Sequence, residues 1–109
     1  MKKIETIKSK ETFSIIIHQG KMLKSTYCVI YYLPNNTIKT YYGIAVSKSL
    51  GNAVIRNKLK RQYRNIIDNN KFLFQKQTNY IIMIRKESLN VSFEILNNNV
   101  KTLLEKGDK

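Results

Sequence analysis

The sequence is poor in several residue types, and each scarcity excludes a class of protein. It contains one cysteine, so a disulfide scaffold is excluded, and Cys28 has no metal-ligand companion spaced nearby. No apolar run approaches the roughly 20 residues that a membrane-spanning helix needs. The basic N-terminus is not followed by the apolar segment of a signal peptide. We therefore expect a soluble, cytoplasmic protein with a single domain over residues 1–109.

Acidic residues are scarce as well, with seven Asp and Glu against 20 Lys and Arg and a formal net charge of +13. Residues 12–67 carry nine Lys and Arg and no carboxylate at all. A merely solvated surface mixes both signs of charge, whereas a field of one sign attracts polyanions. The charge distribution therefore predicts a nucleic-acid partner, with an anionic membrane surface as the second candidate.

The titratable residues offer little for catalysis by the protein itself. A protein nuclease needs either a carboxylate cluster that holds metal ions or a histidine-centred acid–base pair. The seven acids show no paired spacing, and His18 has no evident partner. We therefore predict no catalytic residue and no metal site in the protein.

Apolar periodicity and capping residues predict the order helix, strand, strand, helix, strand, helix, which is an α+β fold with a small sheet packed by helices. The helices are predicted from Ser9, a capping residue, to Gly20, and over residues 52–69 and 91–106. The strands are predicted over residues 26–33, 38–47 and 79–85. Because Pro34-Asn35-Asn36 supplies turn residues, the first two strands are predicted to form a hairpin.

The predicted helix over residues 52–69 has two different faces. At about 100° per residue, its polar face gathers Arg56, Asn57, Lys60, Arg61 and Arg64. Its apolar face gathers Ile55, Leu59, Tyr63 and Ile66. We expect the apolar face to bury against the sheet and the cations to point outward, where arginine grips phosphate through two parallel hydrogen bonds. Lys48 precedes the helix, and the backbone N–H groups around Asn52 add an anion site.

Aromatic residues crowd the predicted hairpin: Tyr27, Tyr31, Tyr32, Tyr41 and Tyr42. Such side chains either fill a half-buried sheet or form a stacking surface for unpaired bases. We assign stacking to Tyr31 and core packing to Tyr32 and Tyr42, and we also expect Phe72, Phe74 and Phe93 in the core.

Residues 47–61 read Ser-Lys-Ser-Leu-Gly-Asn-Ala-Val-Ile-Arg-Asn-Lys-Leu-Lys-Arg. This segment resembles S-K-K-x-G-N-A-V-x-R-N-R-x-K-R-x-x-R, the signature of the bacterial ribonuclease P protein component. The opening helix with Phe13, the strand Cys28-Val29-Ile30-Tyr31 and the strand from Tyr80 to Arg85 also resemble that family, so that the resemblance spans residues 7–105.

The resemblance implies a subunit that assembles with a catalytic RNA, in a complex that removes the 5′ leader from precursor tRNA by Mg²⁺-dependent hydrolysis. The active site and most of the Mg²⁺ are then expected in the RNA. The implied partners are the catalytic RNA and precursor tRNA, with no protein partner required and no membrane. The implied fold is a ribosomal protein S5 domain 2-like sandwich with a left-handed βαβ crossover, an exception to the right-handed rule.

Matching by position also implies the site residues. Contacts to the catalytic RNA fall on Asn52, Arg56, Asn57, Lys58, Lys60, Arg61 and Arg64. A sheet cleft for the leader is lined by Phe13, Ile17, Tyr31 and Tyr41, with Lys48 near its rim. Lys58 and Ser49 replace basic residues of the signature, Ile17 replaces an aromatic residue, and Tyr41 replaces a basic one. Two alternatives remain: an RNA-binding module without enzymatic role, such as a ribosomal protein, and a protein-only nuclease.

Overall fold

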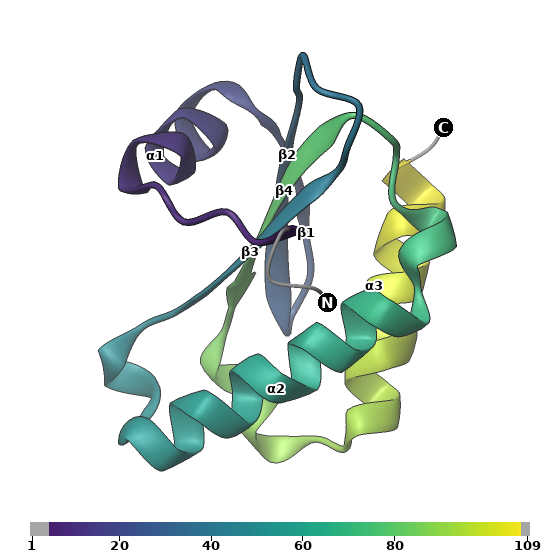
Figure 1. Cartoon of the computed structure of the whole chain (residues 1–109). Helices are drawn as coiled ribbons and strands as arrows, with labels where there is room; N and C mark the ends of the chain where they lie inside the picture. The colour runs from purple at the N-terminus through teal and green to yellow at the C-terminus, as the bar shows by residue number, and fades with distance from the viewer. Residues whose placement is uncertain (1–4, 108–109) are drawn as a thin grey trace.

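The computed structural model describes residues 5–107 as a four-stranded sheet with helices on both faces. The elements in chain order are α1 (Lys10–Gln19), β1 (Lys21–Lys24), β2 (Cys28–Pro34), β3 (Tyr41–Val46), α2 (Ala53–Asn69), β4 (Thr78–Ile84) and α3 (Phe93–Gly107). Short 3₁₀ helices include η2 (Lys48–Leu50), η3 (Lys71–Leu73) and η4 (Lys86–Asn90). Helix α1 covers one face of the sheet, and α2 and α3 cover the other (Figure 1). The predicted α+β class is confirmed.

The ends of α1 and α2 lie where the capping residues predict them. The Ser9 hydroxyl accepts a hydrogen bond from the Thr12 backbone N–H at 3.3 Å, and the Asn52 carboxamide accepts one from Ile55 N–H at 3.0 Å. Gly20 ends α1, and a Cβ there would lie 2.6 Å from the Tyr32 carbonyl oxygen. Only glycine therefore allows the chain to turn so closely from α1 into β1.

The hairpin predicted between residues 26–33 and 38–47, which contain β2 and β3, is wrong. The strand order is β1-β2-β4-β3, so that β4 lies between β2 and β3, antiparallel to β2 and parallel to β3. The hairpin partner of β2 is β1, a strand that the sequence analysis missed, with Met22 opposite Tyr31. The apolar run of β4 explains this order, because a strand that is buried on both faces belongs in the interior of a sheet.

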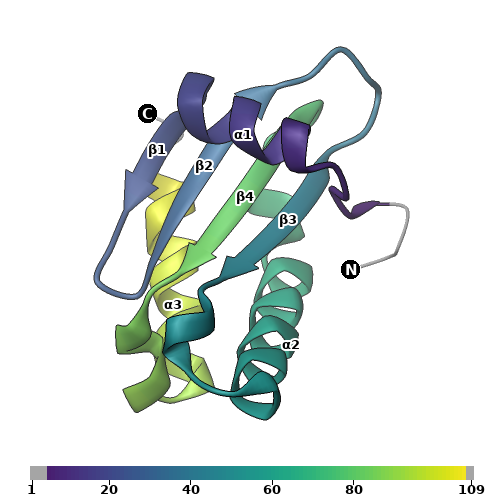
Figure 2. The same ribbon diagram turned by 90° about the vertical axis from the view of Figure 1, so that its left-hand side faces the viewer.

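The connection from β3 through α2 to β4 is left-handed. In Figure 2, β3 and β4 both point downward, α2 returns behind the sheet, and β4 lies to the left of β3. The crossover that the resemblance implies is therefore present. It carries the segment of residues 47–61 away from the ends of β3 and β4, and the first turns of α2 extend beyond the sheet (Figure 2).

The pleat of the strands divides the apolar residues between two cores. The larger core lies between the sheet and α2 with α3, and it contains Cys28, Ile30 and Tyr42. The smaller core lies under α1 and is built on Ile16 and Ile81. The rings of Tyr32 and Tyr42 stack on the ring of Tyr80, with centroid distances of 5.7 and 6.2 Å. This stacking confirms that Tyr32 and Tyr42 belong to the packing of the larger core.

The three phenylalanines predicted for the core behave differently. Phe74 is buried and meets the rings of Tyr42 and Tyr80 edge-on, and Phe93 packs at the margin of the larger core. Phe72 is 77% exposed, so its assignment to the core was wrong. It lies in the short η3 turn, whose neighbours Leu73 and Phe74 contact the core in its place.

Candidate RNA interface

Helix α2 is fixed to the sheet by a buried stripe and exposes most of its polar residues. Leu59, Tyr63, Ile66 and Ile67 are buried on the side of the sheet. Asn57, Lys58, Arg61 and Arg64 are exposed to solvent. The prediction that the polar side chains of this helix point outward is thus confirmed for these four residues.

Arg56 and Lys60 depart from the prediction, because both are half-buried. Arg56 lies three residues before Leu59 and therefore borders the buried stripe. Its Nε atom is buried and has no hydrogen-bond partner within residues 5–107. Arg56 thus lies at the border of the buried stripe, with one buried donor that residues 5–107 leave unpaired.

The positive charge of α2 is not cancelled by neighbouring acids. In the described part of the chain, the ion pairs join Lys71 to Glu5 and to Asp68, and none includes a cation of α2. Opposite charges are needed to neutralise a basic face. The face therefore remains available to a polyanion.

The loop before α2 is shaped by its own side chains. The Ser47 hydroxyl accepts a hydrogen bond from Ser49 N–H at 3.2 Å, and Gly51 has a φ of 153°, which disfavours other residues. Asn52 caps the helix through its oxygen, so that the structure adds a structural role to its predicted RNA contact. Lys48 is exposed in η2.

Four of the five residues predicted to bind the leader come together on the α1 face of the sheet. Phe13, Ile17, Tyr31 and Tyr41 are half-buried around Ile16 and Ile81. The ring of Phe13 lies against the backbone of Gly43, where a Cβ would come within 2.6 Å of Cζ. Lys48 lies outside this cluster, in η2 beyond the end of β3.

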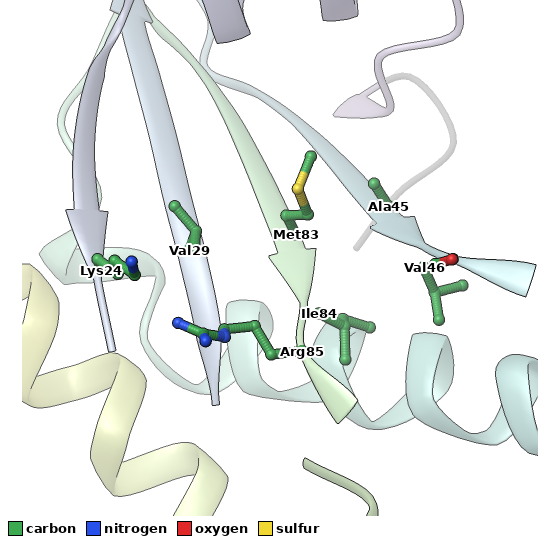
Figure 3. Close-up of a pocket in the computed structure, with 8 residues that line it drawn as sticks. Lys24, Val29, Ala45, Val46, Met83, Ile84 and Arg85 are labelled. Carbon is green, nitrogen blue, oxygen red and sulfur yellow. The ribbon is translucent and has the colours of Figure 1, made fainter. Parts of the chain in front are cut away.

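Beyond α1, the same face of the sheet is an open groove of about 530 Å³. Its floor is one row of residues in register across the four strands: Lys24, Val29, Met83 and Ala45. Figure 3 shows Lys24 at the edge of this row and Arg85 at the end of β4. Arg85 donates a hydrogen bond to the Ser25 carbonyl at 3.2 Å, which holds its guanidinium at the groove.

Sequence reasoning missed this groove. Val29 lies two residues before Tyr31 and shares its face, and Met83 lies two residues after Ile81 and shares the face of Ile81. This alternation of side chains along each strand was the signal from which Val29 and Met83 could have been found. Ala45 and Lys24 could not be added to it, because β3 was predicted against the wrong strand and β1 was not predicted at all.

The buried titratable groups are built for packing. Burial raises the pKa of the Cys28 thiol to about 11, against hydrogen bonds from Ser25 and Tyr63 that lower it, so the thiol stays protonated and unreactive. Burial also raises the pKa of Tyr63, whose hydroxyl shares a hydrogen bond with Ser88 at 2.9 Å. Among residues 5–107, no three His, Cys, Asp or Glu side chains gather as a metal-binding group. No helix in this part of the chain is long and apolar enough to cross a bilayer.

An α+β sheet with a left-handed crossover, an uncancelled basic helix and an open groove beside an aromatic cluster defines a small RNA-binding protein. Comparison with known proteins makes this class specific. The family model Ribonuclease P matches residues 1–108. The ribonuclease P protein component of Acholeplasma laidlawii is 32% identical over 97% of this chain and 91% of its own length. That of Mycoplasma capricolum is 40% identical over 88% of this chain and 89% of its own length.

Solved structures agree with these relatives. The ribonuclease P protein of Staphylococcus aureus matches with a TM-score of 0.86 and 28% identity, over 94% of each chain. That of Thermotoga maritima matches with a TM-score of 0.84 and 29% identity, over 94% of this chain and 96% of its own. The chain belongs to the ribonuclease P family, as the protein subunit of this ribonucleoprotein endoribonuclease. Its partner is therefore the ribonuclease P RNA, and its role is in tRNA processing.

Proposed function

We propose that the subunit works through two surfaces, with the exposed face of α2 on the ribonuclease P RNA and the groove of the sheet on the 5′ leader of precursor tRNA. The observation that carries this proposal is their junction. Ser47 lines the groove, Lys48 follows it in η2, and Asn52 opens α2 four residues later. One continuous segment thus links the surface for the catalytic RNA to the surface for the substrate.

The contribution of α2 is electrostatic. Arg61 and Arg64 project freely, and Arg56 offers an unpaired donor on the flank. Each phosphate that these side chains neutralise releases condensed counterions, so the affinity falls steeply as salt is added. The asparagine and the lysine beside them, Asn57 and Lys58, supply donors to ribose or phosphate oxygens.

The aromatic cluster under α1 and the groove beside it combine stacking with phosphate contacts. Phe13 and Tyr31 present half-exposed rings on which unpaired bases stack, at about 1–3 kcal/mol per base. Lys24 and Arg85, at the lower end of the groove, supply positive charge for the phosphates that follow. Because every base has a stacking face, this mode of binding tolerates many leader sequences, as a processor of many precursor tRNAs requires.

The chemistry itself is proposed to belong to the RNA. The residues described offer no cluster of carboxylates, and the phosphates of a folded RNA are ligands of the kind Mg²⁺ prefers. We propose that the Mg²⁺ of the reaction is bound mainly by the RNA and that the protein raises substrate affinity. The buried free thiol of Cys28 is compatible with a reducing compartment, and we propose the cytoplasm.

A reconstitution assay tests the division of labour. Protein alone, RNA alone and both together are given precursor tRNA at low Mg²⁺, and we expect efficient cleavage from the mixture only. Cleavage by the protein alone would support a protein-only nuclease. A mixture that cleaves no better than the RNA alone would support an RNA-binding module without enzymatic role.

Substitutions test the two surfaces separately. Arg64→Ala should weaken binding of the ribonuclease P RNA and reduce the salt slope by about one phosphate contact, whereas Lys101→Ala, an exposed cation of α3, should do neither. Phe13→Ala and Tyr31→Ala should weaken binding of precursor tRNA but spare a substrate without leader. Equal losses on both substrates would reject the groove as the leader site.

A further inference from the structure

A second cavity lies on the other flank of α2, away from Arg56 and away from the groove of the sheet. It has a volume of about 380 Å³ and is enclosed between α2 and the segment from η4 to α3. One stripe of α2 at helical spacing forms one side: Ile55, Lys58, Leu59 and Gln62. Ser88, Leu89 and Val91 form the other. Neither the sheet groove nor the outward face of Arg61 and Arg64 accounts for it.

The cavity has an apolar interior and a polar rim. Leu59 and Ser88 form its floor and are 3% and 2% exposed. Its walls include Ile55 and Leu89, two large apolar side chains that remain 39% and 42% exposed. Large apolar side chains that stand exposed side by side mark a surface that is covered on binding.

The floor is preformed. The Ser88 hydroxyl donates to the Tyr27 carbonyl at 2.8 Å and shares a hydrogen bond with Tyr63. The donor of this hydroxyl is therefore used within the fold, and η4 is tied to the core of the sheet. A cavity whose floor is already held in place binds its ligand without a large loss of conformational entropy.

The rim carries the free polar groups. Within residues 5–107, the carboxamide of Gln62 forms no hydrogen bond and the ammonium of Lys58 forms no ion pair. A carboxamide both donates and accepts, as the edge of a nucleobase does. The ammonium group of Lys58 attracts the phosphate attached to such a base.

We propose that this cavity receives one unstacked nucleobase of the ribonuclease P RNA, held between Ile55 and Leu89, with Gln62 at its edge and Lys58 at its phosphate. Charge complementarity selects RNA over an apolar peptide, because the α2 side of the cavity belongs to residues 12–67, which contain no carboxylate, and Arg61 lies beside Lys58 on the helix. The inference rests on the proposed function, since it places the base in the same RNA that the exposed face of α2 binds. It gives the subunit an anchor for one position of that RNA in addition to general attraction to phosphate.

This anchor differs from phosphate contacts in its response to salt. Apolar contact with a base releases no counterions, whereas phosphate contacts do. Removing one wall should therefore weaken binding by the same factor at every salt concentration. The slope of affinity against salt should stay that of the unsubstituted protein.

The test measures binding of the full-length protein to ribonuclease P RNA over a series of salt concentrations. We expect Leu89→Ser to weaken binding about fivefold to tenfold with an unchanged slope. Gln62→Ala should weaken it about threefold. The matched control is Ile95→Ser, at an apolar side chain of α3 that is 46% exposed, and it should bind as the unsubstituted protein does.

Chemical probing of the RNA bases provides the second readout. One nucleotide should be shielded by the unsubstituted protein and by the Ile95→Ser variant, but should regain reactivity with Leu89→Ser. Unchanged affinity or an unchanged pattern for both Leu89→Ser and Gln62→Ala would overturn the inference, as would self-association that Leu89→Ser abolishes. Failure of the proposed function looks different, since the unsubstituted protein would then not bind the RNA or Arg64→Ala would leave the salt slope unchanged.

Discussion

Replacing Gly43 by alanine tests how closely α1 is seated on the sheet beside the groove. The new Cβ would lie 2.6 Å from Cζ and 3.1 Å from Cε2 of Phe13, well inside the usual carbon–carbon contact of about 3.5–4.0 Å. The strand cannot yield easily, because Gly43 pairs with Ile81 of β4 and its neighbour Tyr42 bridges to Thr6. The ring of Phe13 must therefore move, and it can do so because it is only half-buried.

The cost follows from these contacts. Overpacking in a core costs about 1–3 kcal/mol, and the loss of backbone freedom on replacing glycine by alanine returns about 0.4–1 kcal/mol. Since the ring can tilt outward, we expect a net loss of about 1 kcal/mol. For a domain of this size that corresponds to a fall in Tm of about 4 °C. In a Phe13→Ala background no ring opposes the new methyl group, and the same substitution should be neutral or slightly stabilising.

Urea unfolding of the four proteins in this cycle measures the coupling between the two positions. We expect a coupling energy of about 1 kcal/mol or more, which is large for an exposed pair but usual for residues in contact. Gly43→Ala should also weaken binding of leader-bearing substrate and leave binding of the ribonuclease P RNA unchanged. If Gly43→Ala costs the same with and without the Phe13 ring, the contact does not set the groove and the reasoning is refuted.

Three further predictions concern charge and burial. Burial, with smaller effects of Glu5, Tyr80 and Asp68, raises the pKa of Tyr42 from 10.0 to about 12, so its contribution to stability is complete below pH 10.0 and is lost as the pH rises toward 12. The free energy of unfolding, measured in urea at a series of pH values, should fall less between pH 10.0 and about 12 for Tyr42→Phe than for the unsubstituted protein. Superimposable profiles would contradict this. Cys28, with a pKa raised to about 11 by burial, should react with a thiol reagent only as the protein unfolds, and labelling of the folded protein at the rate of a free thiol would show that it is accessible. Lys71→Met removes the ion pair with Glu5 at 2.7 Å and should cost at most about 1 kcal/mol, less at high salt, whereas Lys76→Met, at an exposed lysine of the same connection, serves as the control and should cost nothing measurable.

The helices were predictable because their signals are local. Ser9 and Asn52 cap the helices that they precede in the sequence, and the stripe from Leu59 to Ile66 repeats with the period of a helix. The sheet order was not predictable in this way. Whether β3 pairs with β2 or with β4 depends on a contact between residues far apart in the chain, and the turn residues between β2 and β3 favour the wrong neighbour. Strand β1 is short and has lysine at both ends, so it carries no pattern of its own.

The candidate site likewise combines residues that local spacing predicts with residues that only the tertiary fold brings together. Residues of one helix, such as Arg61 and Arg64, could be assigned to one face from their spacing. The burial of Arg56 could not, because it depends on how the start of α2 packs in the fold and not on spacing within the helix. The groove row from Lys24 to Ala45 takes one residue from each of four strands, and the register of those strands is needed to bring them together.

The central position of β4 also constrains how the chain acquires its structure during synthesis. Among the strands of residues 5–107, β3 pairs with β4, and β4 leaves the ribosome after α2. Until then, the residues of β1, β2 and the basic segment have been made, but no completed sheet exists for α2 to pack on. Because such a non-local closure is slow, we expect the arrival of β4 to govern the rate at which the whole subunit folds.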